Sequence, residues 1–483
     1  MNHEPSTREQ QPSPTHTAPA QQPFQRARPF LAASAALGIG AGFLLASVLS
    51  ISQGLRLPLG LWWVALVQAH GHAQLFGWAG LFVLGVALHF LPRLRGTPLA
   101  APGAVGWSLG LLAGGLALCA ISQPLLALGW GGTLPWQVLW GAAALAQICG
   151  ATGVVGILLL TLRRGPPLAR RPALQAVLPP LLCALCACWL ALVLNAAGVA
   201  GALLSQQVLV SPRLDALSVA LGLYGFLVPV ALGMAVRLLP LYLGLRPFPP
   251  QAFQAIFWCY LAGLLLRLLA AGFGQGTALS TRLDAAGAAL LGGALLAFLL
   301  LQGLLLTRRR RQLQVAAVHT DRVQLPARPY PVALGNNPAL YGPFARLLQS
   351  AFAWLALAAA LLLANGVLQL LGLSAFAPDD LIRHALTVGF IALLIFGVGQ
   401  RMLPGFAGQP LRSPRLVAAT LWLGNAAVLL RVVPGLLGLL LGGLALPPAV
   451  PALLGIAFAC SGPLGWLALC CFTYNLWRIL RPA

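Results

Sequence analysis

The stretch HGHAQLFGWAGLFVLGVALHFLP, residues 70–92, combines three histidines with a long apolar run. A run of about 20 apolar residues is long enough to cross the hydrocarbon core of a bilayer as a helix. The whole chain has the same character, since 59% of its 483 residues are hydrophobic and only 7% are charged. This composition excludes a water-soluble globular protein and predicts an all-α integral membrane protein in contact with the lipid bilayer.

Similar apolar runs recur along the chain and predict about twelve transmembrane helices. Their expected ranges are 30–53, 59–91, 103–129, 134–162, 174–204, 213–243, 251–273, 282–306, 344–373, 379–404, 414–441 and 449–478. Residues 1–29 are rich in Pro, Gln, Ser and Thr, which predicts a disordered tail. Residues 30–483 then form a single polytopic membrane domain, with 307–343 as a long cytoplasmic loop.

The basic residues indicate the orientation of the chain in the membrane. All 29 are arginines, and most lie in the loops that follow even-numbered segments, including the RRRR of 308–311. The positive-inside rule therefore places these loops and both termini on the cytoplasmic side. The net charge of +22 is explained as this orientation signal, and nucleic acid is not an expected partner.

An internal repeat connects distant parts of the chain. HAQLFGWAGLFVLGVALHFLPRLRGTPL (72–99) aligns without gaps with HALTVGFIALLIFGVGQRMLPGFAGQPL (384–411). A third copy, ALGLYGFLVPVALGMAVRLLP (220–240), keeps the same glycine frame but has alanine in place of the first histidine. The shared glycines, eight residues apart, are expected to let helices pack closely in lipid.

The helix after each copy also repeats, since Trp258 and Arg267 match Trp422 and Arg431. The sequence therefore predicts three four-helix repeats in a pseudo-three-fold arrangement. The expected repeats span about 30–165, 174–306 and 344–478.

The repeat places His72 and His384 at equivalent positions of two helices. Two imidazoles from facing helices are a common axial pair for haem iron, so these residues are predicted to bind haem b. The alternative is that both are buried histidines bonded to a backbone carbonyl or a hydroxyl. His89 aligns with Arg237 and Arg401 and is interpreted as a basic helix end.

His70 precedes His72 by two residues, which turns it about 200° away on a regular helix. It is therefore not expected to bind the same metal as His72. Three roles remain open for it: a ligand of copper, which imidazole suits, a group that orients a neighbour, or a side chain facing a polar cavity.

Three arginines near the same membrane face are candidates for the haem propionates, because the planar guanidinium pairs well with carboxylates. They are Arg267, Arg383 and Arg431. The alternative is a purely structural role with nearby aspartates. These aspartates are Asp215, Asp284, Asp379 and Asp380.

The two histidine-bearing motifs, HGHAQLFGWAGLFVLGVALHFLPRLRG and RHALTVGFIALLIFGVGQRMLPGFAG, resemble those of the NnrS family. The resemblance implies a haem- and copper-containing protein of the bacterial inner membrane that responds to nitric oxide and nitrosative stress. In that family a glutamate commonly follows the first motif's second histidine, whereas Ala73 stands here.

A more distant resemblance is to subunit I of haem-copper oxidases, which implies twelve helices and haem ligands on helices 2 and 10. Those enzymes need further histidines on helices 6, 7 and 10 for the active-site metals, and segments 6 and 7 of this chain contain none. A proton-pumping terminal oxidase is therefore not expected. The alternative function is a membrane transporter or metal-handling protein that uses the repeat interface as its pathway.

Overall fold

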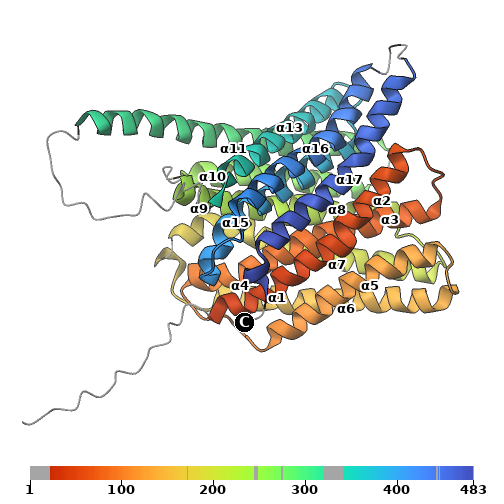
Figure 1. The fold of residues 1–483 in the computed structure, drawn as a ribbon, viewed down its shortest axis with the longest axis horizontal. Coiled ribbons are helices and arrows are strands. Elements are labelled where there is room, and N and C mark those ends of the chain that lie inside the picture. The colour runs from red at the N-terminus through yellow and green to blue at the C-terminus, as the bar shows by residue number, and fades with distance from the viewer. Residues whose placement is uncertain are drawn as a thin grey trace, which may run out of the picture.

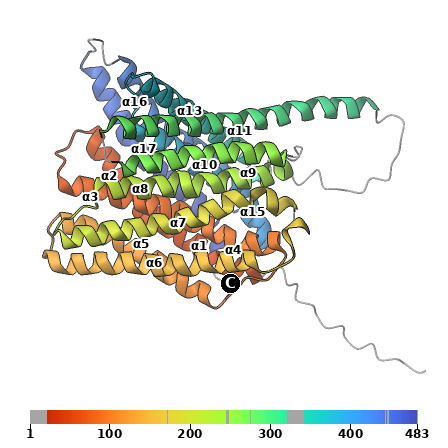
Figure 2. The same cartoon turned by 180° about the vertical axis from the view of Figure 1, so that it is seen from behind.

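The computed structural model describes residues 22–170, 172–243, 248–273, 276–319, 341–441, 444 and 447–481. Within these residues, twelve helices are long and apolar enough to cross a membrane, which confirms the predicted number. We number them as spans 1 to 12 in chain order. They pack side by side in one bundle, and α11 projects beyond the other helices (Figures 1 and 2).

Spans 1, 2, 6 and 10 each contain a π-helical segment, whereas the other eight spans are single α-helices. Span 1 comprises α1 (Gln22–Leu37), η1 (Gly38–Gly42) and α2 (Phe43–Gly54), and span 2 comprises α3 (Leu61–His72), η2 (Ala73–Gly80) and α4 (Leu81–Arg95). Span 6 comprises α8 (Pro212–Ala220), η4 (Leu221–Leu227) and α9 (Val228–Leu243), and span 10 comprises α14 (Asp379–His384), η6 (Ala385–Ala392) and α15 (Leu393–Ala407). The others are α5 (Ala104–Ala127), α6 (Thr133–Arg163), α7 (Pro172–Leu204), α10 (Pro250–Gly272), α11 (Ala278–His319), α13 (Phe344–Leu370), α16 (Pro414–Leu441) and α17 (Ala449–Asn475). Two short helices, η3 (Leu168–Arg170) and α18 (Trp477–Leu480), lie outside the spans.

Two expected boundaries differ from the structure. Helix α1 begins at Gln22, so part of the predicted tail is helical, because Phe24, Ala27 and Phe30 form an apolar face that is buried. Helix α11 continues to His319, well into the predicted loop. The rest of the predicted tail (1–21) and loop (320–340) lies outside the described residues.

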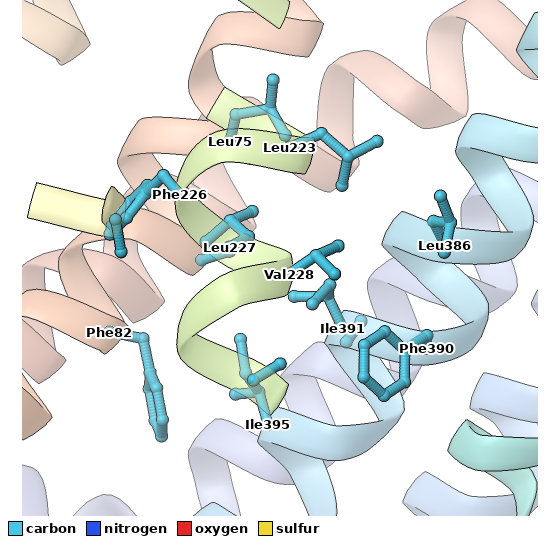
Figure 3. Close-up of a cluster of buried hydrophobic side chains, with 14 of the residues drawn as sticks. Leu75, Phe82, Leu223, Phe226, Leu227, Val228, Leu386, Phe390, Ile391 and Ile395 are labelled. Carbon is cyan, nitrogen blue, oxygen red and sulfur yellow. The ribbon is translucent and has the colours of Figure 1, made fainter. Parts of the chain in front are cut away.

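Spans 2, 6 and 10 form the centre of the bundle. In the most apolar 18-residue stretch of each of these spans, 78%, 72% and 67% of the residues are buried. In no other described span does this share exceed 50%. Figure 3 shows side chains of all three spans in one buried apolar cluster, with Phe82 from span 2, Phe226 and Leu227 from span 6 and Ile391 from span 10. The three helices that carry the aligned motif are therefore the three that surround the bundle axis.

The same three spans share a local irregularity. Segments η2, η4 and η6 begin directly after His72, Ala220 and His384, the positions that the sequence alignment places in register. A π-helical turn is rare and occurs often at functional sites. This correspondence supports the relation among the central spans, while the complete four-helix repeat stays a prediction.

The shared glycines allow close helix packing, as predicted. A Cβ at Gly85 would lie 2.9 Å from the Phe30 Cβ, and a Cβ at Gly225 would lie 2.7 Å from the Ala187 Cβ. A Cβ at Gly389 would lie 2.7 Å from the Trp354 side chain. Spans 2, 6 and 10 thus each pack tightly against the span that precedes them in the chain.

Candidate functional site

A cavity of about 500 Å³ lies between the starts of spans 2, 6 and 10, and residues of spans 1, 11 and 12 also line it. This volume is within the range of about 300–1,000 Å³ for pockets that hold small molecules and cofactors. Most of the lining is apolar or aromatic, including Phe43 and Trp78. Its titratable and charged lining residues are His70, Asp215, Asp380, Arg383, His384 and Arg431.

The His70 imidazole lines this cavity and is held by span 1. Its Nδ1–H donates to the backbone carbonyl of Gly42, 2.9 Å away, where the π-helical segment η1 ends. In the neutral ring this bond leaves the lone pair on Nε2. Metal-binding histidines typically donate the other ring N–H to a carbonyl or carboxylate in this way. His70 therefore has the arrangement of a ligand that binds through Nε2.

His384 faces the same cavity from span 10. Its Nδ1–H donates to the backbone carbonyl of Asp380 at 2.7 Å, and Oδ1 of the same aspartate lies 3.3 Å from Nδ1. The other carboxylate oxygen of Asp380 accepts from Arg431 Nη2 at 3.0 Å. The ring is thus oriented by an aspartate that an arginine fixes in turn, and Nε2 is again left to serve as a ligand.

The structure does not bring His72 and His384 together. His72 does not line the cavity, and its Nε2–H donates to Gln147 Oε1 on α6 at 2.5 Å. The Gln147 amide donates in turn to the carbonyl of Gly115 at 3.1 Å. A rotation that relates two helices carries equivalent residues into different clefts, so register alone does not place two side chains in one site. In the structure, the histidine that shares a cavity with His384 is His70.

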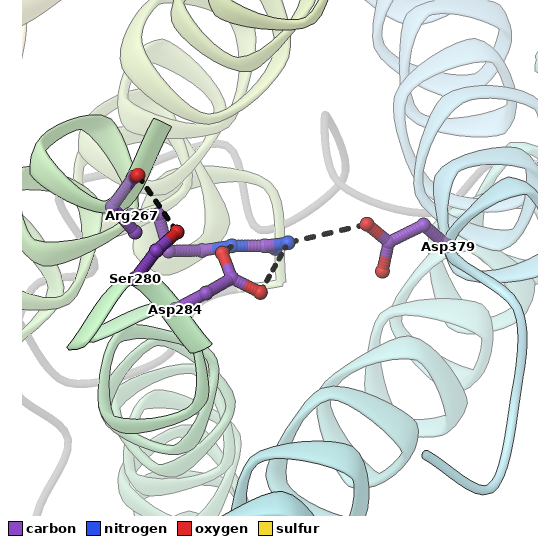
Figure 4. Close-up of polar contacts among 5 residues, drawn as sticks. Arg267, Ser280, Asp284 and Asp379 are labelled. Atoms are coloured by element: carbon purple, nitrogen blue, oxygen red, sulfur yellow. Dashed lines mark hydrogen bonds and ion pairs between the residues drawn. The ribbon is translucent and has the colours of Figure 1, made fainter. Parts of the chain in front are cut away.

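The three arginines that are predicted to bind the haem propionates do not all lie at the cavity. Arg267 Nε donates to Asp284 at 2.8 Å, and its Nη2 lies 3.3 Å from Asp379, so aspartates occupy this guanidinium (Figure 4). Arg267 also does not line the cavity. For Arg267, the geometry thus supports a structural role in ion pairs with aspartates.

Arg431 and Arg383 both line the cavity. Arg431 is bonded to Asp380, and its guanidinium lies over the Phe458 ring, 4.3 Å from the centroid. The Arg383 guanidinium makes no ion pair or hydrogen bond with any residue that the structure describes. Arg383 is therefore the arginine whose donors remain open toward the cavity.

The sequence interpretation missed Trp63 and Gly42, which belong to the site, and also Gln147, which holds His72 outside the cavity. Trp63 lines the cavity, and its indole Nε1 is buried with no hydrogen-bond partner in the described part of the chain. Gln147 could have been noticed as a polar side chain within an apolar segment. Gly42 contributes only a backbone carbonyl, for which side-chain patterns give no signal.

No group of three or more His, Cys, Asp or Glu side chains is positioned for a metal ion among the described residues. A copper site at His70 thus has no set of neighbouring protein ligands in this part of the chain. His89 lies elsewhere, with its ring 4.2 Å from the Phe406 ring centroid and its Nδ1 accepting from Arg93 at 2.8 Å. The helix continues past His89 to Arg95, and Arg93 and Arg95 are the basic side chains of its last turn. His89 is therefore not the basic helix end that the sequence predicted.

The bundle has the fold of the haem-copper terminal oxidases. A cryo-EM structure of a heme-copper terminal oxidase dimer matches it with a TM-score of 0.64 and 13% sequence identity, covering 97% of this chain and 85% of that chain. Residues 333–482 match the family described as NnrS protein, which confirms the resemblance inferred from the motifs. This matched region includes His384 but not His70. No curated protein matches the chain.

Proposed function

We propose that this membrane protein binds a haem b between His70 and His384 and acts in the handling of nitric oxide or nitrosative stress. The observation that carries the proposal is the pair of imidazoles in one cavity, each bonded through Nδ1 to a backbone carbonyl. Haem sites in helix bundles are built from such side chains on facing helices. The nitric oxide role rests on the likeness to the NnrS family.

The remaining lining also fits a haem. Its macrocycle needs a largely apolar pocket, which the aromatic and aliphatic lining supplies. Its propionates need donors, and the open guanidinium of Arg383 and the unpartnered indole N–H of Trp63 are of this kind. We therefore assign Arg383 and Trp63, and not Arg267, as donors to the haem propionates.

The two histidines would hold the haem with different firmness. His384 is the firmly held ligand, because Asp380 and Arg431 fix its ring. His70 is the more easily displaced ligand, because a single backbone carbonyl orients it. His70 and His384 would hold the haem, which would supply one-electron transfer and the binding of a diatomic gas. The protein would sit in the bacterial inner membrane with both termini cytoplasmic, as the arginine distribution predicts.

The test is the optical spectrum and metal content of the purified protein and three variants. We expect His70→Ala and His384→Ala to lose the bis-histidine Soret spectrum, whereas the matched control His72→Ala retains it. A spectrum that is lost in His72→Ala but kept in His70→Ala would contradict the assignment. Metal analysis of the same samples reports whether copper is bound as well as iron.

The transporter alternative uses the same cavity and is separated by the same experiment. A colourless wild type, after expression with adequate haem supply, would favour transport or metal handling through this cavity. A haem-loaded wild type would favour the proposal above.

A further inference from the structure

A second cavity lies between spans 2, 6 and 10, on the side of the bundle axis where these spans end. Its volume is about 120 Å³. Spans 4, 5 and 9 add a few residues to its walls. We call this cavity the axial chamber. Representative lining residues are Phe82, Leu91, Ala231, Met234, Ile395 and Met402.

The lining of the axial chamber is apolar throughout. Every side chain that lines it is aliphatic, aromatic or a methionine thioether. A buried water needs about two to four polar partners, so water is poorly held in such a space. Apolar cavities of about 150 Å³ in proteins stay dry and take up benzene or xenon. The chamber is therefore suited to a small uncharged guest.

The chamber adjoins the cavity of about 500 Å³ that His70 and His384 line, which we call the histidine cavity. Leu227 and Ile391 line both spaces, and both side chains are almost fully buried. Figure 3 shows them on neighbouring spans, with Leu227 at the end of η4 and Ile391 within η6. These two side chains therefore form part of the boundary between the two spaces.

We propose that the axial chamber binds a small uncharged gas and holds it next to the histidine cavity. An uncharged diatomic molecule loses little hydration on entering an apolar space, whereas ions and water lose much more. The chamber thus favours uncharged gas molecules over ions and water through its apolar lining alone. The role as a gas supply for haem rests on the proposed function, with nitric oxide as the gas, but gas binding itself does not.

The experiment is structure determination of crystals of the full-length protein under xenon pressure. We expect a xenon peak between spans 2, 6 and 10 in the wild type. Ala231→Phe places a ring in the chamber and should abolish the peak. Ala216→Phe is the matched control, because Ala216 lies in the same span, is exposed and does not line the chamber. The control should keep the peak.

Three results would overturn the proposal: a wild type without xenon in the chamber, ordered water or an acyl chain in its place, or a folded Ala231→Phe protein that keeps the peak. If Ala231→Phe does not fold, Ala235→Val adds less volume at a second lining position and should lower the xenon occupancy. A Soret spectrum of the same preparation separates the two proposals. A Soret band without bound xenon would contradict gas binding in the chamber and leave the haem proposal intact. Bound xenon without a Soret band would contradict only the role of the chamber as a gas supply for haem.

Discussion

The His384 imidazole donates to the Asp380 backbone carbonyl at 2.7 Å, and the carboxylate of that same aspartate is held by Arg431 at 3.0 Å. One residue thus orients the histidine through its main chain and anchors it to span 11 through its side chain. The adjacent residue, Asp379, binds Arg267 on span 7 instead. Arg267 and Arg431, which the repeat aligns, therefore meet two neighbouring aspartates at the start of span 10.

This arrangement predicts the effect of Asp380→Asn. The backbone bond to His384 is kept, but the charge that pairs with Arg431 is lost, so the ring is less firmly oriented. We expect haem affinity to fall by about 10- to 100-fold, the usual effect of changing a group that orients a metal ligand. Haem transfer to apomyoglobin measures this loss. Asp379→Asn is the control and should leave haem affinity unchanged, since its carboxylate does not contact His384.

Arg267 is predicted to stabilise the fold without affecting the haem spectrum. Its guanidinium joins Asp284 and Asp379, and the arginine side chain is only 13% exposed. Arg267→Gln should lower the free energy of unfolding by about 2 kcal/mol, because hydrogen bonds to charged groups contribute about 1.5–3 kcal/mol. Thermal unfolding in detergent measures the loss. The exposed Arg415→Gln should show no such loss, and a changed Soret band in Arg267→Gln would return this residue to the haem site.

The unequal support of the two histidines predicts which one leaves the iron. His70 has one orienting bond, whereas His384 contacts both the carbonyl and the carboxylate of Asp380. In the reduced, haem-loaded protein, His70→Ala should bind carbon monoxide at least about tenfold faster than the wild type, because no ligand has to be displaced first. Stopped-flow absorbance follows this reaction. Equal rates in the two proteins would show that His70 does not occupy the iron.

The packing of the central spans predicts a strong effect of one methyl group. Gly225→Ala places a Cβ 2.7 Å from the Ala187 Cβ, so two helices must move apart. Overpacking of this kind costs about 1–3 kcal/mol. Gly156→Ala on α6 is the control, since a Cβ there meets nothing within 4 Å. The control should be neutral or slightly stabilising, because alanine favours a helix over glycine. Melting temperatures of the two variants should therefore move in different directions or by clearly different amounts.

The orientation in the membrane is predicted by the arginine distribution and can be tested with two cysteines. Arg164 and Gln206 are exposed, and they follow the ends of α6 and α7 respectively. Arg164→Cys should react with a membrane-impermeant maleimide only from the cytoplasmic side, and Gln206→Cys only from the outside. Labelling of intact cells and of inverted vesicles measures this difference. The reverse pattern would contradict the expected topology.

The sequence predicts the spans well because hydrophobic length is a local property of each segment. The alignment of the histidine motifs also identifies the three central spans, since these carry the close-packing glycines and the π-helical segments. The choice between His70 and His72 depends instead on what each ring contacts. Gly42 on span 1 and Gln147 on span 4 decide it, and both are distant in sequence. Such contacts depend on how helices are rotated in the bundle, which no single segment specifies.

The π-helical segment η2 (Ala73–Gly80) begins after His70 and contains Trp78, and both residues line the histidine cavity. A π turn contains more residues than the α turn that it replaces, so removing one residue from Ala73–Gly80 could restore a regular helix without breaking it. Because a π turn accommodates its extra residue locally, the α-helical turns on either side would keep their facing. His70 lies before the segment and would still face the cavity, whereas Trp78 lies within it and would change direction. The segment thus allows span 2 to lose one residue while His70 keeps its place.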